Sequence, residues 1–169
     1  MFEEDDFIIV TGGKISESKY QTLQLMEAVK NLNKSNVKLL VFGSISNEIK
    51  EKFDCLCSEN IIYLGWATVF ESYQYFEVAD LVIFPATHSV YWEQAAGMGK
   101  PLMVKYWDGI THVDLGSNVI FLKEDSEKEI RENLTYLLNH PEKFNNMKKC
   151  AESCISNFSY IDIAKRCLK

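Results

Sequence analysis

One stretch of sequence decides how this chain folds: Phe84-Pro85-Ala86-Thr87-His88-Ser89-Val90-Tyr91-Trp92-Glu93-Gln94-Ala95-Ala96-Gly97-Met98-Gly99-Lys100-Pro101. It begins at the end of an apolar run, passes through a short loop, and continues as a helical segment with one glutamate near its start. The Gly-Lys-Pro at 99–101 is a stop signal for that helix. A loop that leads backbone N–H groups into a helix N-terminus makes an anion site. The stretch therefore predicts a strand-loop-helix unit with a ligand-binding loop.

Apolar runs alternate with helical patterns on both sides of this stretch. The expected strands are 7–10, 37–42, 61–64, 81–84, 102–104 and 118–122, and the expected intervening helices are 18–33, 45–57, 69–78 and 90–98. Strands that alternate with helices imply right-handed crossovers and a parallel sheet, and continuous apolar runs indicate a sheet covered on both faces. We expect an α/β fold, a Rossmann-like doubly wound parallel sheet of about six strands. Extra C-terminal helices are expected at 125–139, 141–155 and 159–168.

Composition narrows the classes of function. The chain has 169 residues, which predicts a single domain over 1–169, and 18 Lys+Arg against 24 Asp+Glu give a net charge of −6. Nucleic-acid binding needs clustered positive charge, so we expect no nucleic-acid partner. No apolar run approaches the length of a membrane span, and the acidic residues at 3–6 are unlike a secretory signal. We expect a cytoplasmic protein.

The cysteines and acidic residues do not predict a metal site. The five cysteines form no Cys-x-x-Cys, and the Cys55–Cys57 pair has no second ligand pair at a suitable spacing. No Asp-x-Asp follows a predicted strand. We therefore expect free thiols and a site that works without a metal or a cofactor.

In a doubly wound sheet, ligands bind beyond the carboxyl ends of the strands. After the first strand, Gly12 and Gly13 permit positive φ and close approach to a ligand, and Lys14 and Lys19 can bring positive charge to a diphosphate. The plainer interpretation is a strand-to-helix turn with two solvated lysines. The segment matches neither a P-loop nor a dinucleotide fingerprint.

Two further loops follow the third and fourth strands. Gly65 lets the chain turn where backbone groups could read a base edge, and Trp66 either stacks on a planar ligand or caps the core. Ser89 is the expected N-cap of the next helix, whose free N–H groups could instead receive a phosphate. His88 and His112 both fall on this ligand side of the sheet.

Glu93 lies one turn into the helix, between a tryptophan and the small residues 95–97. One interpretation is a solvated acid that suits the helix dipole. Because its neighbours are those of a helix packed on both sides, we expect this carboxylate to have a specific partner.

The chain resembles the C-terminal, donor-binding domain of GT-B-fold glycosyltransferases, most closely family 4 of the retaining enzymes. The resemblance runs from residue 7 to about 165 and rests on an ordered set of motifs. These are the Gly-Gly-Lys before Lys19, Leu40-Val41-Phe42-Gly43, Ile62-Tyr63-Leu64-Gly65-Trp66, Ala79-Asp80-Leu81-Val82-Ile83-Phe84-Pro85, and Glu93-Gln94-Ala95 completed by Gly97 to Pro101.

The resemblance implies a role for each loop. Lys14 and Lys19 resemble the basic pair that grips the diphosphate, with Gly12 and Gly13 beside it. Residues 65–68 resemble the nucleobase loop. The backbone of His88, Ser89 and Val90 resembles the segment that faces the distal phosphate. Glu93 resembles the second glutamate of the family's Glu-x7-Glu motif, which holds the ribose hydroxyls.

One departure stands out. Pro85 stands eight residues before Glu93, where the family has its first glutamate. The sugar-facing half of the site therefore differs, and His88 or His112 is available to take over part of that task. A divergent subgroup, such as surface-polysaccharide transferases, fits this pattern, and so does an inactive relative.

The expected activity is transfer of a hexose from a UDP- or GDP-linked donor to an acceptor hydroxyl. Negative charge grows on the distal phosphate as the sugar–phosphate bond breaks, and Lys14, Lys19 and His88 are the residues expected to serve that step. The resemblance implies an N-terminal acceptor domain or subunit that this chain lacks, and any membrane association would come through it. Two alternatives remain: a non-catalytic nucleotide-sugar-binding or regulatory module, and half of a sugar-nucleotide epimerase.

Overall fold

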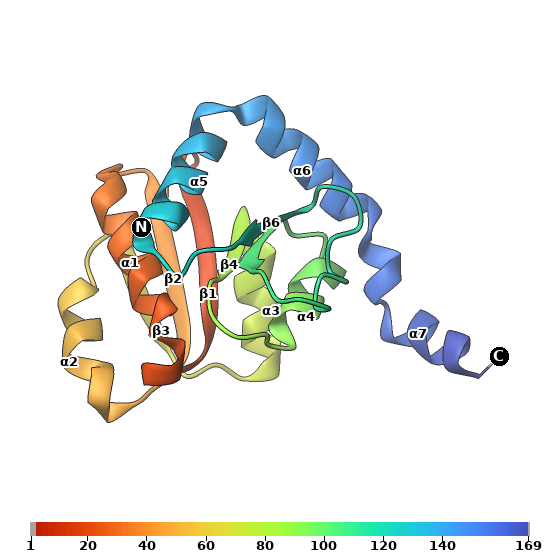
Figure 1. Ribbon diagram of the computed structural model, residues 1–169, viewed down its shortest axis with the longest axis horizontal. Coiled ribbons are helices and arrows are strands. Elements are labelled where there is room, and N and C mark those ends of the chain that lie inside the picture. The colour runs from red at the N-terminus through yellow and green to blue at the C-terminus, as the bar shows by residue number, and fades with distance from the viewer. Residues whose placement is uncertain (1–2, 169) are drawn as a thin grey trace.

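A six-stranded sheet forms the centre of the protein (Figure 1). The computed structural model describes residues 3–168. The strands are β1 (Phe7–Ile15), β2 (Val37–Ile45), β3 (Ile61–Gly65), β4 (Leu81–Phe84), β5 (Leu102–Lys105) and β6 (Val119–Leu122). All neighbours pair in parallel, in the order β3-β2-β1-β4-β5-β6. This confirms the predicted Rossmann-like doubly wound sheet.

Helices cover both faces of the sheet. They are α1 (Gln21–Leu32), α2 (Asn47–Leu56), α3 (Val69–Val78), α4 (Tyr91–Gly97), α5 (Glu127–Asn139), α6 (Pro141–Ser153) and α7 (Tyr160–Cys167), with 3-10 turns η1 (Glu17–Lys19) and η2 (Ile155–Phe158). Successive strand residues point to opposite faces. Ile9 therefore packs in the core with α1, α2, α5 and α6, whereas Val10 packs in the core with α3 and α4.

The first strand is longer than the sequence predicted. Gly12, Gly13 and Lys14 do not form a turn but continue β1, in register with Phe42, Gly43 and Ser44 of β2. Close packing explains the glycines. A Cβ on Gly12 would lie 2.6 Å from the Phe42 ring, and a Cβ on Gly43 would lie 2.0 Å from the carbonyl oxygen of Gly13. The glycines thus let two strands approach each other where a turn was expected.

The strand order places a switch point between β1 and β4. The chain runs outward from β1 through β2 to β3, then crosses back to β4 and runs outward through β5 to β6. Loops diverge at the carboxyl ends of β1 and β4, and this crevice is where ligands bind in such sheets.

Among residues 3–168, the helices are too short or too polar to span a membrane.

Candidate functional site

A surface cavity of about 330 Å³ lies at the switch point. Its walls come from three strand ends and the start of α4. The lining residues are Gly13, Lys14, Lys19, Phe42, Gly43, Ser44, Trp66, Ala67, Ser89 and Tyr91. We call it the lysine cavity. It brings together residues predicted from four separate loops.

Lys14 and Lys19 give this cavity its charge. Burial lowers the pKa of Lys19, and repulsion from the Lys14 ammonium lowers it further. Within residues 3–168, neither ammonium forms an ion pair or a hydrogen bond. The pKa of Glu48 is lowered mainly by a hydrogen bond with Ser46, and the positive charge of Lys14 adds to this effect. Two like charges that converge without an acidic partner favour binding of an anion.

The aromatic side chains around the cavity differ in exposure: Phe42 is buried, Tyr91 is half-buried and Trp66 is exposed. Phe42 and Tyr91 contact each other edge to face at 5.3 Å between ring centroids. Trp66, directly after Gly65 at the end of β3, is 70% exposed. Trp66 therefore does not cap the core, and its ring is free to stack on a planar ligand.

The loop before α4 contributes Ser89 to the cavity. The helix begins one residue later than predicted, because its N-cap is Val90 and no side chain caps it. The Ser89 hydroxyl instead accepts a long hydrogen bond, 3.4 Å, from the Tyr91 N–H. The prediction of Ser89 as the N-cap was thus wrong by one residue.

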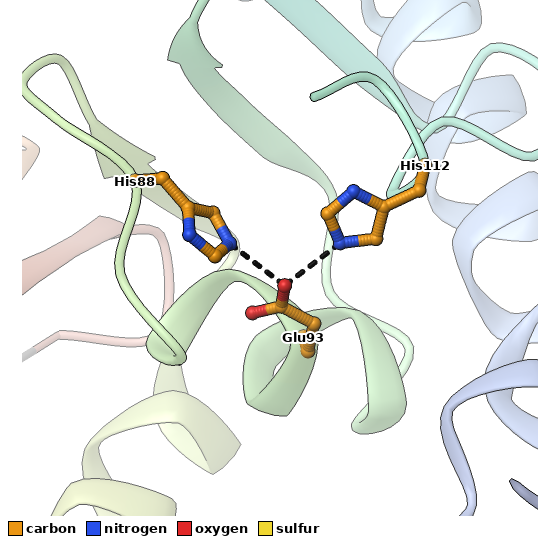
Figure 2. A group of neighbouring side chains, drawn as sticks. All are labelled: His88, Glu93 and His112. Atoms are coloured by element: carbon orange, nitrogen blue, oxygen red, sulfur yellow. Dashed lines mark hydrogen bonds and ion pairs between the residues drawn. The ribbon is translucent and has the colours of Figure 1, made fainter. Parts of the chain in front are cut away.

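A second group of predicted residues meets at α4 (Figure 2). Glu93 Oε1 lies 2.7 Å from His88 Nε2 and 2.7 Å from His112 Nε2. Glu93 sits on α4, His88 on the β4–α4 loop, and His112 on the β5–β6 loop. The expectation that Glu93 has a specific partner is confirmed. We call these three residues the histidine–glutamate cluster.

Electrostatics fix the Glu93 carboxylate in its charged form. Burial pushes the pKa of Glu93 upward, but hydrogen bonds with His112 and His88 outweigh it and hold this pKa below its ordinary value. The second oxygen, Oε2, is buried and has no partner among the described residues. One oxygen is therefore shared by two imidazoles, whereas the other is unsatisfied.

The two groups share one edge of the sheet but not one cavity. Lys14, Lys19 and Ser89 line the lysine cavity, whereas Glu93 and Val90 line an apolar cavity of about 290 Å³ beside η2 and α7. Sequence reasoning found both groups but missed their separation. It also missed Phe42 as a cavity wall, since only its register opposite Gly12 in the sheet reveals it.

Comparisons with known proteins agree with the fold. No protein-family model matches the chain, and no curated protein matches it. Among solved structures, the C-terminal domain of a group 1 family glycosyl transferase (LpcC) from Francisella tularensis is similar, with a TM-score of 0.76, 15% identity, and coverage of 92% of this chain and 87% of that one.

Two longer structures match as well. HepE from Anabaena, in complex with UDP and glucose, has a TM-score of 0.74 and 17% identity, covering 98% of this chain and 49% of that one. A UDP-GlcNAc 2-epimerase from Neisseria meningitidis bound to UDP-GlcNAc has a TM-score of 0.71 and 14% identity, covering 99% and 46%. The chain thus has the fold of a GT-B C-terminal domain and spans about half the length of these two proteins.

Proposed function

We propose that this domain binds the nucleotide-diphosphate sugar donor of a glycosyltransferase, with the diphosphate in the lysine cavity. The observation that carries the proposal is the convergence of Lys14 and Lys19, without an acidic partner, at the switch point of the sheet. An anion placed between them relieves their mutual repulsion and compensates the burial of Lys19. HepE, which has this fold, was crystallised with UDP and glucose.

The chemical task at this site is stabilisation of a leaving group. When the bond between the sugar and the distal phosphate breaks, the electron pair stays on the phosphate oxygen. The ammonium groups of Lys14 and Lys19 line the same cavity and are proposed to stabilise the charge that develops there. Removal of one such preorganised donor typically raises a barrier by about 3 kcal/mol.

The rest of the nucleotide is assigned to the neighbouring side chains. Trp66 is exposed on the cavity wall and is proposed to stack on the base. Glu93 is proposed to hold ribose hydroxyls through Oε2, because Oε1 already contacts both histidines. Because Oε2 is buried, this contact requires the groups that cover it to move.

Transfer itself is proposed to need a second domain. HepE is about twice as long as the region that this chain matches, so an acceptor-binding half is expected to face the lysine cavity. We expect the 169-residue chain to bind donor nucleotides and to show little turnover alone.

An epimerase half is the second candidate, because a UDP-GlcNAc 2-epimerase has the same fold over 99% of this chain. The two candidates differ in their need for an acceptor. A transferase reconstituted with its second domain releases the nucleotide only when an acceptor is present. An epimerase alters the sugar nucleotide without one.

Calorimetry of the purified chain against UDP, GDP and ADP tests the donor site. Lys14→Met and Lys19→Met keep the length of the side chain and remove its charge. Lys34→Met is the matched control, because Lys34 is exposed and precedes β2 at the opposite edge of the sheet. Weaker binding in the first two variants alone supports the proposal. Equal affinity in all three variants refutes it.

A further inference from the structure

The histidine–glutamate cluster presents three ligand atoms to one point outside the lysine cavity (Figure 2). One ring nitrogen each of His88 and His112 and a Glu93 carboxylate oxygen lie within 4.8 Å of one another, and both Nε2 atoms lie 2.7 Å from Oε1. Two imidazoles and one carboxylate form a ligand set that Zn²⁺ takes in proteins, with a further position left for water or substrate. The sequence had predicted no metal here, because the ligands come from segments that only the fold brings together.

We propose that His88, Glu93 and His112 bind one divalent transition-metal ion, for which Zn²⁺ is the best-matched probe. Imidazole nitrogen suits Zn²⁺ and its first-row neighbours and disfavours Mg²⁺ and Ca²⁺, which take oxygen ligands. The proposal does not require the donor site, since none of the three residues lines the lysine cavity and the ribose contact proposed for Glu93 uses its other oxygen, Oε2.

The geometry needs only a small adjustment. Metal–ligand bonds of 2.0–2.1 Å at tetrahedral angles place ligand atoms about 3.3 Å apart. Each imidazole nitrogen stands 2.7 Å from Oε1, so the two rings must withdraw by roughly half an ångström to admit the ion. The side chains of His88 and His112 are 35% and 48% exposed and come from loops, which leaves them room to rotate.

In the metal-free protein, two hydrogen bonds hold the cluster together, one from each histidine to Oε1 of Glu93. A carboxylate oxygen only accepts hydrogen bonds, so both imidazoles must direct an Nε2–H toward Oε1. Zn²⁺ would replace these two protons and bind the nitrogen lone pairs, which moves the ring proton of each neutral histidine to Nδ1. Among the described residues no lysine or arginine pairs with Glu93, so no bound cation has to leave.

The ion would connect two loops across α4. His88 and His112 lie 5 residues before and 19 residues after Glu93, on the loops that follow β4 and β5. A ligand that binds the folded chain and not the unfolded one stabilises it by mass action. Binding is therefore expected to raise the melting temperature and to protect the loop at 106–118 from proteolysis.

The test is calorimetric titration of the chelator-treated, reduced protein with Zn²⁺, followed by histidine NMR. We expect one equivalent to bind, with the ring proton of both cluster histidines moving from Nε2 to Nδ1. In His88→Gln, His112→Gln and Glu93→Gln the affinity should fall by more than the roughly 10- to 100-fold that loss of an outer-shell partner causes. No nucleotide is present, so failure of the donor proposal would leave this result unaffected.

Two controls keep the outcome clear. His140→Gln removes the third histidine, which contacts Tyr136 on α5, and should leave the affinity unchanged. Cys55→Ser/Cys57→Ser tests binding by thiolates. Absence of Zn²⁺ binding, binding that persists in the His88 and His112 variants, or binding lost only in the cysteine variant would each overturn the proposal. Circular dichroism confirms that every variant is folded.

Discussion

The lysine cavity and the histidine–glutamate cluster both include residues of one short helix, α4, and they differ in how charge is balanced. In the cavity, Lys14 and Lys19 approach each other, and neither forms an ion pair with a described residue. In the cluster, the Glu93 carboxylate is held by two imidazoles. The cavity is therefore suited to an anion and is strained electrostatically without one. In the cluster, Oε1 of Glu93 is paired with both imidazoles, whereas Oε2 has no partner among the described residues, and a cation could take the place of the two hydrogen bonds.

The two regions also differ in what supports them. The cavity rests on regular strands, because Gly13 and Gly43 are paired within the β1–β2 ladder. The cluster rests on two loops that converge on α4. A change in the backbone of β1 or β2 should therefore affect the cavity most strongly, whereas a change in the β4–α4 or β5–β6 loop should affect the cluster most strongly.

The largest effect is expected from Gly43→Ala. The new Cβ would lie 2.0 Å from the Gly13 carbonyl oxygen, at a φ of +113° that disfavours any side chain. Overpacking and backbone strain together should lower the free energy of unfolding by about 3–5 kcal/mol. Gly109→Ala, in the β5–β6 loop, is the control, since its φ is +75° and nothing lies within 4 Å of the added Cβ. Equal destabilisation of both variants in denaturant titrations would contradict this distinction.

The next largest effect concerns binding. Lys14→Met/Lys19→Met removes two charge-assisted contacts to a diphosphate, each worth about 1.5–3 kcal/mol. UDP affinity should fall at least 100-fold, since each 1.4 kcal/mol is about tenfold. Isothermal titration at two salt concentrations measures it, and the salt dependence should diminish in the variant. Retained affinity would place the diphosphate elsewhere.

A smaller effect is expected from Trp66→Ala. Stacking of a base on an aromatic ring contributes about 1–3 kcal/mol. Loss of the exposed Trp66 ring should weaken UDP binding by that amount without lowering the melting temperature. Fluorescence quenching of Trp66 by UDP provides a second measurement. A large drop in thermal stability would show that the ring packs on the protein.

The smallest effect is a pH dependence of stability. Burial and the charge of Lys14 lower the pKa of Lys19 in the folded state. At pH values below this lowered pKa, Lys19 is charged in both states, and its charge is less stable in the folded state than in the unfolded one. Lys19→Met should therefore be more stable than the natural chain near pH 7. Its advantage should shrink as pH rises through the lowered pKa toward the ordinary lysine value. A difference in melting temperature that does not change with pH would contradict this electrostatic cause.

The sequence predicted the elements better than their ends. Continuous apolar runs identified all six strands, because buried parallel strands carry no polar face. The predicted end of β1 was wrong, since the glycines at 12–13 indicated a turn. In the structure these glycines instead allow close packing against Phe42 and β2. That contact is tertiary and leaves no local pattern. The meeting of His88, Glu93 and His112 depends on the path of two loops, so spacing alone could not reveal it.

The unpaired ammonium groups of Lys14 and Lys19 have a practical consequence. Orthophosphate and sulfate carry the charge that this cavity attracts, so they should compete with any nucleotide for it. Affinities measured in phosphate buffer would understate the natural value. A non-coordinating zwitterionic buffer is the appropriate medium, and orthophosphate becomes a simple competitor with which to map the cavity.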